Sequence, residues 1–328
     1  MVKLMVNKSK LILVLVLAAF LVVGLASAGF FDFLNGNSYE TVKIGFLPSD
    51  HDAALFVADK QGLYQQKGIK AELVQFDNGG DLMAAMASGE IDVGYVGIAP
   101  VLSSVEKGVP VKIISSAQTE GSAIVVSKES NIKAAPDLKG KSIATPGEDT
   151  IQYVLLSYYL KQNGMSVDDL NVLTMKVPSM NDALRTGEID GGITFQPYAS
   201  FILTGTNNKV LADSKAILPN HPCCVVVVSD DFLINHENKA KDIVAIHKNA
   251  TKFINNSIEN NKSDEVIKLL PEDCVANSNA EHYSLGSFPF ISGIDDDFKN
   301  DVDNFQNLEV DMGLLKEKIP QDKLFWQP

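Results

Sequence analysis

The 328-residue chain is poor in basic residues and has a single arginine, Arg185. Its 28 lysines and arginines face 41 aspartates and glutamates, so the formal net charge is −13. Proteins that bind nucleic acid need a basic surface, and no nucleic-acid partner is therefore expected. With one guanidinium available, an anionic ligand has to be held by lysines, hydroxyls, side-chain amides or backbone N–H groups.

The short motifs of common catalytic sites are also absent. The sequence has no G-x-S-x-G, no H-E-x-x-H and no P-loop lysine motif, and its five histidines are scattered. Its composition, 45% hydrophobic and 21% charged, is that of a globular protein with enough residues for two lobes. We predict from this that the protein is not an enzyme and uses no cofactor.

Cysteine is scarce, with two adjacent residues, Cys223 and Cys224, and a third, Cys274, far downstream. A disulfide between Cys274 and either neighbour, with Cys224–Cys274 as the candidate pair, is one alternative; a vicinal bridge and three buried thiols are the others. Adjacent cysteines lack the two-residue gap that is typical of zinc sites. No metal site is therefore predicted, although His221 is close by.

Long apolar runs are absent beyond the first 28 residues. Three lysines precede an apolar run at 11–23, and Ala-Ser-Ala at 26–28 suits cleavage by a signal peptidase. We predict a signal peptide over 1–28, a linker over 29–40, and a mature protein that is secreted or lies in the periplasm or at the outer face of the cytoplasmic membrane. The alternative is an uncleaved membrane anchor, although the run is shorter than the ~20 residues that span a bilayer.

The chain contains a distant internal repeat. ASGEIDVG at 87–94 and RTGEIDGG at 185–192 are 98 positions apart, and each follows a short helical pattern. Their glycines suit the left-handed position that ends a helix, and the residues that follow alternate as in a strand. The loop around Asp50 matches the loop around Asp149, since each joins a strand to a helix. The repeat predicts two similar half-structures.

Strands alternate with helices in both halves, which predicts an α/β fold with mainly parallel sheets in two lobes joined by two crossover strands. We assign 41–118 and 233–328 to the first lobe and 119–232 to the second, and we expect only helices in the C-terminal segment. Ligands bind beyond the carboxyl ends of parallel strands, so the cleft between the lobes is the expected site.

The order of several short segments resembles a known family. These segments are GFLP at 45–48, LFVA at 55–58, KQGLY at 60–64, NGGD at 78–81, SGEID at 88–92, GIAP at 97–100, LKGK at 138–141 and FQPY at 195–198. Over about residues 41–260 the chain resembles the substrate-binding proteins of ABC importers for nitrate, sulfonate, taurine, bicarbonate and thiamine-pyrimidine precursors. The resemblance implies the type II periplasmic-binding-protein fold.

The resemblance also implies a function. It is that of a monomeric extracytoplasmic receptor that captures a small ligand between its lobes and delivers it to an ABC permease in the membrane. A sulfonate, taurine, nitrate or bicarbonate-like anion is favoured as the ligand. The alternative is a thiamine-pyrimidine-precursor binding protein or a related pyrimidine synthase. The synthases have a cysteine-rich segment, of which only Cys223 and Cys224 remain here, and they lack an export signal.

The candidate ligand-binding residues follow the matched strands or lie at the first crossover. They are Ser49, Asp50, His51, Gly97, Ile98, Gln118, Thr150, Gln196 and Tyr198. Helix N-termini at these loops favour an anion, whereas the carboxylates among and beside them oppose one. A zwitterion or a neutral heterocycle therefore remains an alternative ligand.

Overall fold

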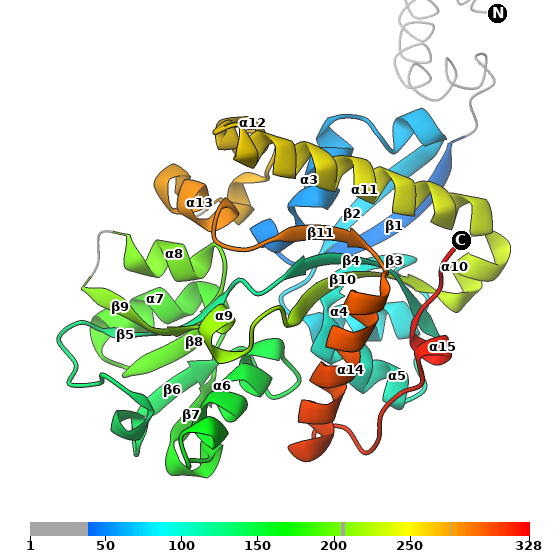
Figure 1. Ribbon diagram of the computed structural model, residues 1–328. Coiled ribbons are helices and arrows are strands. Elements are labelled where there is room, and N and C mark those ends of the chain that lie inside the picture. The colour runs from blue at the N-terminus through cyan, green and yellow to red at the C-terminus, as the bar shows by residue number, and fades with distance from the viewer. Residues whose placement is uncertain (1–38, 205–206, 276) are drawn as a thin grey trace, which may run out of the picture.

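The computed structural model describes residues 39–204, 207–275 and 277–328, which form two lobes (Figure 1). The predicted signal peptide and nearly all of the predicted linker lie outside these residues. Among the described helices, none combines the length and the apolar character that crossing a bilayer requires.

Lobe I is built on a six-stranded sheet. Its strands lie in the order β11 (Phe290–Gly293), β4 (Val111–Thr119), β10 (Pro222–Ser229), β3 (Val93–Gly97), β1 (Glu40–Phe46) and β2 (Ile69–Gln75). The central strand β1 is parallel to both of its neighbours, whereas β10 is antiparallel to β3 and β4. The four inner strands are mostly buried because helices cover both faces of the sheet.

Helices on the two faces of this sheet come from both ends of the chain. Figure 1 shows α3 and α11 on one face and α4 and α5 on the other. The helices of lobe I are α3 (Ala53–Lys60), α4 (Gly79–Ala87), α5 (Ile98–Glu106), α10 (Asp230–Asn235), α11 (Glu237–Glu259), α12 (Ser263–Ile267), α13 (Ser278–Leu285), α14 (Asp296–Asp311) and α15 (Gln321–Leu324).

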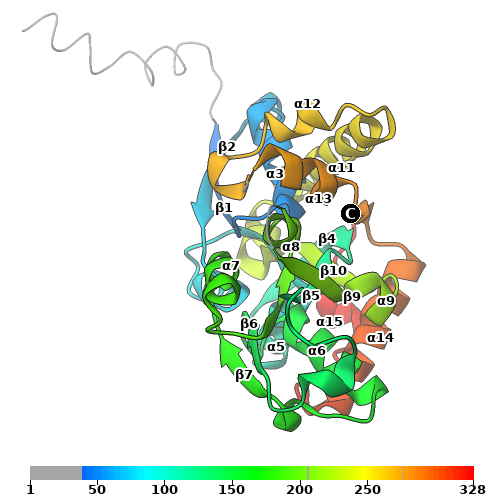
Figure 2. The same ribbon diagram turned by 90° about the vertical axis from the view of Figure 1, so that its left-hand side faces the viewer.

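Lobe II is smaller and has a five-stranded sheet. Its strands lie in the order β7 (Asn171–Thr174), β6 (Ser142–Thr145), β8 (Gly191–Phe195), β5 (Ser122–Ser127) and β9 (Asn208–Asp213). Its helices are α6 (Ile151–Gln162), α7 (Val177–Thr186), α8 (Tyr198–Leu203) and α9 (Ser214–Ile217). Helix α13 of lobe I packs against α8, so the C-terminal part of the chain contacts both lobes (Figure 2).

The two-lobed α/β fold agrees with the prediction, but three details differ. Both sheets are mixed, because β10 in lobe I and β5 in lobe II run antiparallel to their neighbours. The chain returns to lobe I before β10, so the second lobe ends before Pro222 and not at 232. The C-terminal segment also contains a strand, β11. The apolar run at 223–228 predicts a buried strand, but the lobe to which this strand belongs depends on the strands with which it pairs.

The glycines of the internal repeat adopt the predicted left-handed conformation. Gly89 has a φ of 78° and Gly187 a φ of 75°. Both glycines follow a helix and precede a strand, and an L-residue with a side chain rarely adopts this φ. The repeat therefore marks the same helix-to-strand turn in both lobes.

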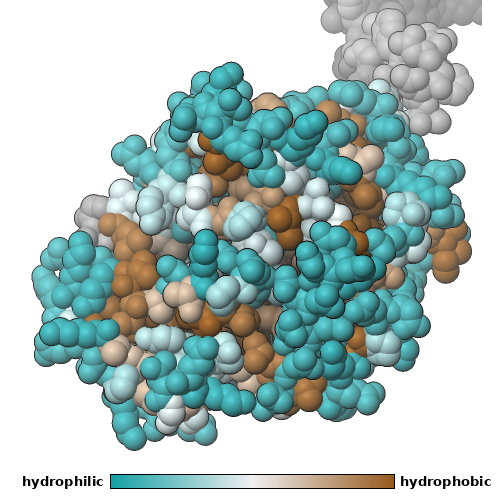
Figure 3. Space-filling model, in the orientation of Figure 1, coloured by the Kyte–Doolittle hydropathy of each residue, from teal (hydrophilic) through white to brown (hydrophobic). Residues whose placement is uncertain are grey.

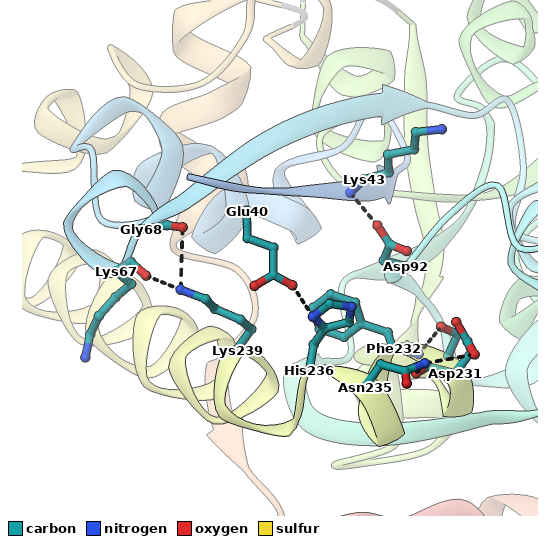
Figure 4. A network of polar contacts seen from close by, with 11 residues as sticks. Glu40, Lys43, Lys67, Gly68, Asp92, Asp231, Phe232, Asn235, His236 and Lys239 are labelled. Carbon is teal, nitrogen blue, oxygen red and sulfur yellow. Dashed lines mark hydrogen bonds and ion pairs between the residues drawn. The ribbon is translucent and has the colours of Figure 1, made fainter. Parts of the chain in front are cut away.

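The aspartates of the repeat also make the same contact twice. The Asp92 carboxylate accepts a hydrogen bond from the Lys43 N–H at 2.8 Å, which Figure 4 shows between the turn and β1. The Asp190 carboxylate accepts one from the Ser142 N–H of β6 at 2.9 Å. Each carboxylate thus holds the turn to the strand that lies beside it, and the two lobes share this device at the level of single atoms.

The described surface is mainly hydrophilic on the face that Figure 3 shows, with hydrophobic side chains scattered among polar ones. The most exposed large hydrophobic residues, Ile234 at 80% and Tyr283 at 66%, belong to different helices. Hydrophobic residues exposed singly are ordinary on globular proteins. The apolar residues that carry the repeat are instead inside the lobes.

Candidate functional site

A cavity with a volume of about 60 Å³ lies between the lobes, at the carboxyl ends of β1, β3 and β8. That volume suits a small ligand. Lobe II lines the cavity with Thr150, Ile151, Gln152 and Phe195. Lobe I lines it with Leu47, Ser49, His51, Asp52, Gly79, Gly97, Pro100, Cys223 and Cys224.

Three helices begin at this cavity. Helix α4 begins at Gly79, α5 begins directly after Gly97, and α6 begins after its N-cap Thr150, whose hydroxyl accepts a hydrogen bond from the Tyr153 N–H at 3.3 Å. The first N–H groups of a helix have no acceptor within the helix, and its N-terminal end carries a partial positive charge. The cavity is therefore surrounded by hydrogen-bond donors that suit an anion.

His51 lies against two thiols at the cavity wall. The Sγ of Cys223 is 3.8 Å and the Sγ of Cys224 is 3.9 Å from His51 Nδ1. All three side chains are buried, and the imidazole packs edge-on against Phe288 with 4.8 Å between the ring centroids. Phe288 follows α13, so the C-terminal segment of lobe I holds the imidazole in place.

A β-bulge turns the two cysteines toward the same imidazole. Successive side chains of a regular strand point to opposite faces, but the pairing of β10 with β4 shifts register on both sides of Cys224. Gln118 fixes this irregular segment, because its Oε1 accepts the Cys224 N–H at 3.1 Å. Cys224 also pairs with Gly97 of β3, which brings the thiols next to the start of α5.

His51 and Cys223 shift each other's pKa values. Burial works against a charged imidazole, but nearby Cys223 and then Asp50 raise the pKa of His51 above its ordinary value. Burial likewise disfavours a thiolate, but a hydrogen bond from Cys224 and the charge of His51 lower the pKa of Cys223 well below its ordinary value. Both shifts act in the direction of an imidazolium–thiolate pair.

Three buried carboxyl groups of lobe I lie near His51 or next to its neighbour Asp50. Burial raises the pKa of Asp52 to about 8, and its Oδ2 accepts the Leu47 N–H at 3.0 Å. Burial also raises the pKa of Asp50, which accepts a hydrogen bond from Ser284 of α13. Burial and then the charge of Asp50 raise the pKa of Glu281 to about 10. The pKa values of Asp52 and Glu281 favour the neutral forms of these two groups at neutral pH, which lowers the negative charge beside the cavity.

Four of the nine predicted ligand-binding residues line the cavity, namely Ser49, His51, Gly97 and Thr150. The other five lie beside or behind it, namely Asp50, Ile98, Gln118, Gln196 and Tyr198. Ile98 is part of the hydrophobic core, and the four polar side chains bond to other protein groups, as Gln118 does with β10.

Several predicted residues join the lobes directly. The Ser49 hydroxyl donates to the Gln196 carbonyl oxygen at 2.7 Å, and the Tyr198 hydroxyl donates to the Pro48 carbonyl oxygen at 3.1 Å. Both polar atoms of the Gln196 side chain form hydrogen bonds. Its Nε2 donates to Ser287 at 3.1 Å, and its Oε1 accepts from Ser200. These side chains hold the lobes together over the cavity.

Residues that sequence reasoning did not assign to the site also reach the cavity. Cys223 and Cys224 were considered for a disulfide, and Gly79 only as part of a family segment. A signal existed for the cysteines, since an apolar strand that begins with two thiols at a crossover is unusual. The turn that contains Asp52 packs against β4 and α13, which lie far along the chain, and no local pattern indicates this burial.

The possible Cys224–Cys274 disulfide is not formed, because Cys223, Cys224 and Cys274 are all buried thiols. The Cys224 thiol faces His51 at the cavity. Cys274 ends the short 3-10 helix η5 (Glu272–Cys274) in the C-terminal part of lobe I. Three buried thiols, one of the open alternatives, describe the structure.

A model described as the NMT1-like family matches residues 36–270. The chain belongs to the NMT1-like family. It is 27% identical over 176 residues to the taurine-binding periplasmic protein of Escherichia coli (strain K12), covering 54% of each chain. It is 25% identical over 240 residues to a 4-amino-5-hydroxymethyl-2-methylpyrimidine phosphate synthase of Schizosaccharomyces pombe, covering 68% of each. The NMT1-like chain thus spans about half the length of the first relative and about two thirds of the second.

Solved structures confirm the fold predicted for this family member. A ligand-binding component of an ABC-type import system from Staphylococcus aureus, with zinc bound, superposes with a TM-score of 0.76 at 22% identity, covering 88% of this chain and 97% of that one. The periplasmic aliphatic sulphonate binding protein SsuA of Escherichia coli gives 0.75 at 19% identity, covering 89% and 93%. This NMT1-like protein has the periplasmic-binding-protein fold.

Proposed function

We propose that this protein is a solute receptor that captures a small ligand between its lobes and delivers it to an ABC permease. The observation that carries the proposal is the cavity itself. Both lobes line it, and helices α4, α5 and α6 begin at its wall. Capture between two lobes needs this arrangement, because closure then surrounds the ligand with donors from both sides. The taurine-binding relative supports the same role.

The favoured ligand is a small anion, or a zwitterion that presents an anionic group, such as a sulfonate. Among the described residues that line the cavity there is no lysine or arginine. The N–H groups at the N-termini of α4, α5 and α6 therefore hold the anionic group in this proposal. Such a site recognises an oxyanion by hydrogen bonds without a guanidinium clamp.

A pyrimidine synthase is the second candidate, favoured by one specific observation. His51, Cys223 and Cys224 place a base and two thiols at the cavity, and a relative named as a pyrimidine phosphate synthase matches 68% of the chain. A receptor releases its ligand unchanged, whereas a synthase converts it. Mass spectrometry of a pyrimidine precursor before and after incubation with the protein distinguishes the two, and an altered mass would contradict the receptor role.

The proposed setting follows from the receptor role. We place the mature protein outside the cytoplasm, secreted, in the periplasm or at the outer face of the membrane, with the signal peptide removed. A monomer suffices, because one chain supplies both walls of the cavity. The partners are the small ligand and the membrane permease, and no nucleic acid is involved.

The decisive experiment measures thermal unfolding with taurine, an alkanesulfonate, nitrate and bicarbonate, added one at a time. A ligand at a hundredfold excess over its Kd stabilises the folded state by about 2.7 kcal/mol. The Gly97→Val variant should then weaken binding of that ligand at least about tenfold, or 1.4 kcal/mol. A Cβ at Gly97 would lie 3.1 Å from the Cδ1 of Ile151, so a larger side chain holds the lobes apart.

A second variant serves as the matched control. Adding Ile151→Ala to Gly97→Val removes the atom that the new side chain meets, and it should restore part of the lost affinity. The unfolding midpoint of each variant without ligand reports whether the fold is intact. Parental affinity in Gly97→Val would contradict ligand capture at this cavity, and a failure of every tested ligand to stabilise the protein would contradict an anion as the ligand.

A further inference from the structure

The His51, Cys223 and Cys224 cluster has the composition of a site for a soft metal ion. One nitrogen and two sulfur atoms lie within 4.8 Å of one another, and all three side chains are buried. Thiolates and imidazoles are the ligands that Zn(II) and Cu(I) prefer, whereas Mg(II) and Ca(II) prefer oxygen. The donor set therefore selects a thiophilic cation.

The distances in the cluster fit a shared ion. A zinc ion about 2.3 Å from a sulfur and about 2.0 Å from a nitrogen sets these two atoms ~3.5–3.7 Å apart at trigonal or tetrahedral angles. The observed separations from His51 Nδ1 are 3.8 Å to Cys223 and 3.9 Å to Cys224. The nitrogen–sulfur separations therefore need to shorten by only a few tenths of an ångström, and the two sulfur atoms lie within 4.8 Å of each other.

The bulge in β10 overturns the sequence argument against a metal. That argument was that adjacent cysteines on a strand lack the gap that lets both thiolates face one ion. The register shifts around Cys224 remove the alternation, and the Gln118 amide holds the bulge from the neighbouring strand. The fold of lobe I therefore holds both thiols close to His51 Nδ1 in the absence of a ligand.

The cluster is also accessible from the cavity. His51, Cys223 and Cys224 all line it, so an ion can reach them, and a further ligand to the ion can come from the cavity side. Two thiolates neutralise a divalent ion, which makes a buried site for Zn(II) favourable.

We propose that His51 Nδ1, Cys223 Sγ and Cys224 Sγ form a binding site for one thiophilic d10 cation, with a fourth coordination position open to the interlobe cavity. The site does not depend on the proposed receptor role, because lobe I alone supplies its three ligands.

The test titrates Zn(II) and, as a coloured reporter, Co(II) into the purified, metal-free chain with its thiols reduced by a phosphine. We expect one ion per chain, with the thiolate-to-metal absorption of Co(II) and no binding of Mg(II). Cys223→Ser and Cys224→Ser should each weaken Zn(II) binding at least about 100-fold, since even second-shell partners of metal ligands account for 10–100-fold. Cys274→Ser is the matched control, because that thiol is buried elsewhere, and it should bind as the parent does.

Alkylation of the parent protein tests the same site without relying on variants that must fold. Zn(II) should slow modification of Cys223 and Cys224 at least about tenfold and leave the rate at Cys274 unchanged, as read by peptide mass spectrometry. The proposal is overturned if Zn(II) binding persists in both cysteine variants, if Cys274→Ser removes it, or if protection in the parent is absent or equal at all three thiols.

Discussion

The loop after β1 in lobe I and the loop after β6 in lobe II occupy equivalent places in the repeat, yet their side chains have opposite surroundings. Asp50 is completely buried, whereas its counterpart Asp149 is exposed. Helix α13 contacts the first loop, and Ser284 of that helix bonds to Asp50. The comparison shows that the repeat preserves the path of the backbone, while segments added outside the repeat determine which loop is desolvated and gains unusual chemistry.

The two lobes also differ in how closely helices pack on the repeated strands, and this difference should produce the largest effect of a single substitution at a fixed, neutral pH. A Cβ at Gly94 would lie 2.8 Å from Leu82 Cδ2, whereas a Cβ at the matching Gly192 would lie 3.4 Å from Met180 Sδ. Gly94→Ala should lower the free energy of unfolding by about 1–3 kcal/mol through overpacking, and Gly192→Ala by much less. Urea unfolding of the two variants measures both, and equal losses would refute the proposed difference in packing.

The aspartates of the repeat should instead behave alike. Asp92→Ala and Asp190→Ala each remove a charged acceptor from a backbone N–H of the adjacent strand, so each should lower the free energy of unfolding by about 1–2 kcal/mol. The asparagine variants keep an acceptor and should lose less. A loss confined to one lobe would show that the shared contact does not contribute equally in the two halves.

The exposed loop of lobe II should influence a buried group of lobe I. Burial raises the pKa of Glu309 in α14 to about 8, and the charges of Asp149 and Glu106 add to this. The folded state therefore holds the proton between about pH 4.5 and 8 while the unfolded state has lost it. The free energy of unfolding should fall as the pH rises through this window, by at most about 1.4 kcal/mol per pH unit.

Glu309→Gln should remove that dependence. The variant should gain stability relative to the parent between pH 5 and pH 9, as measured by urea unfolding at both values. Asp149→Asn is the companion variant, since it keeps Glu309 and removes one neighbouring charge, and its gain should be smaller and in the same direction. A constant difference between parent and Glu309→Gln across this range would contradict the assigned pKa.

The smallest effect is expected where the lobes meet at the surface. Lys176 and Asp77 form an ion pair at 2.6 Å between the lobes, but their side chains are 68% and 61% exposed. Lys176→Ala should therefore change the free energy of unfolding by less than about 1 kcal/mol, and 0.5 M salt should reduce the difference further. A larger loss in thermal or urea unfolding would show that this exposed pair, and not the buried bonds of Ser49 and Tyr198, dominates the contact between the lobes.

Much of the fold was predictable because its signals are local. The repeat at 87–94 and 185–192 predicted two equivalent turns, and the helix starts at Gly97 and Thr150 predicted donors at the cleft. The residues that bond across the lobes were predicted to bind the ligand, because they lie in the same loops. The side chain of Gln196 instead bonds to other protein groups. Amide orientation depends on partners such as Ser287, which lies about ninety positions away.

By itself the sequence determined the two α/β halves, their left-handed glycine turns and the buried character of the run at 223–228, because backbone preference and the spacing of apolar residues act over a few positions. Only the tertiary structure decided which sheet takes β10, how its bulge aims Cys223 and Cys224 at His51, and that Asp50 is buried while Asp149 is exposed. Strand register and desolvation depend on segments far away in the chain, β4 and α13 among them, and no local pattern encodes what covers a loop.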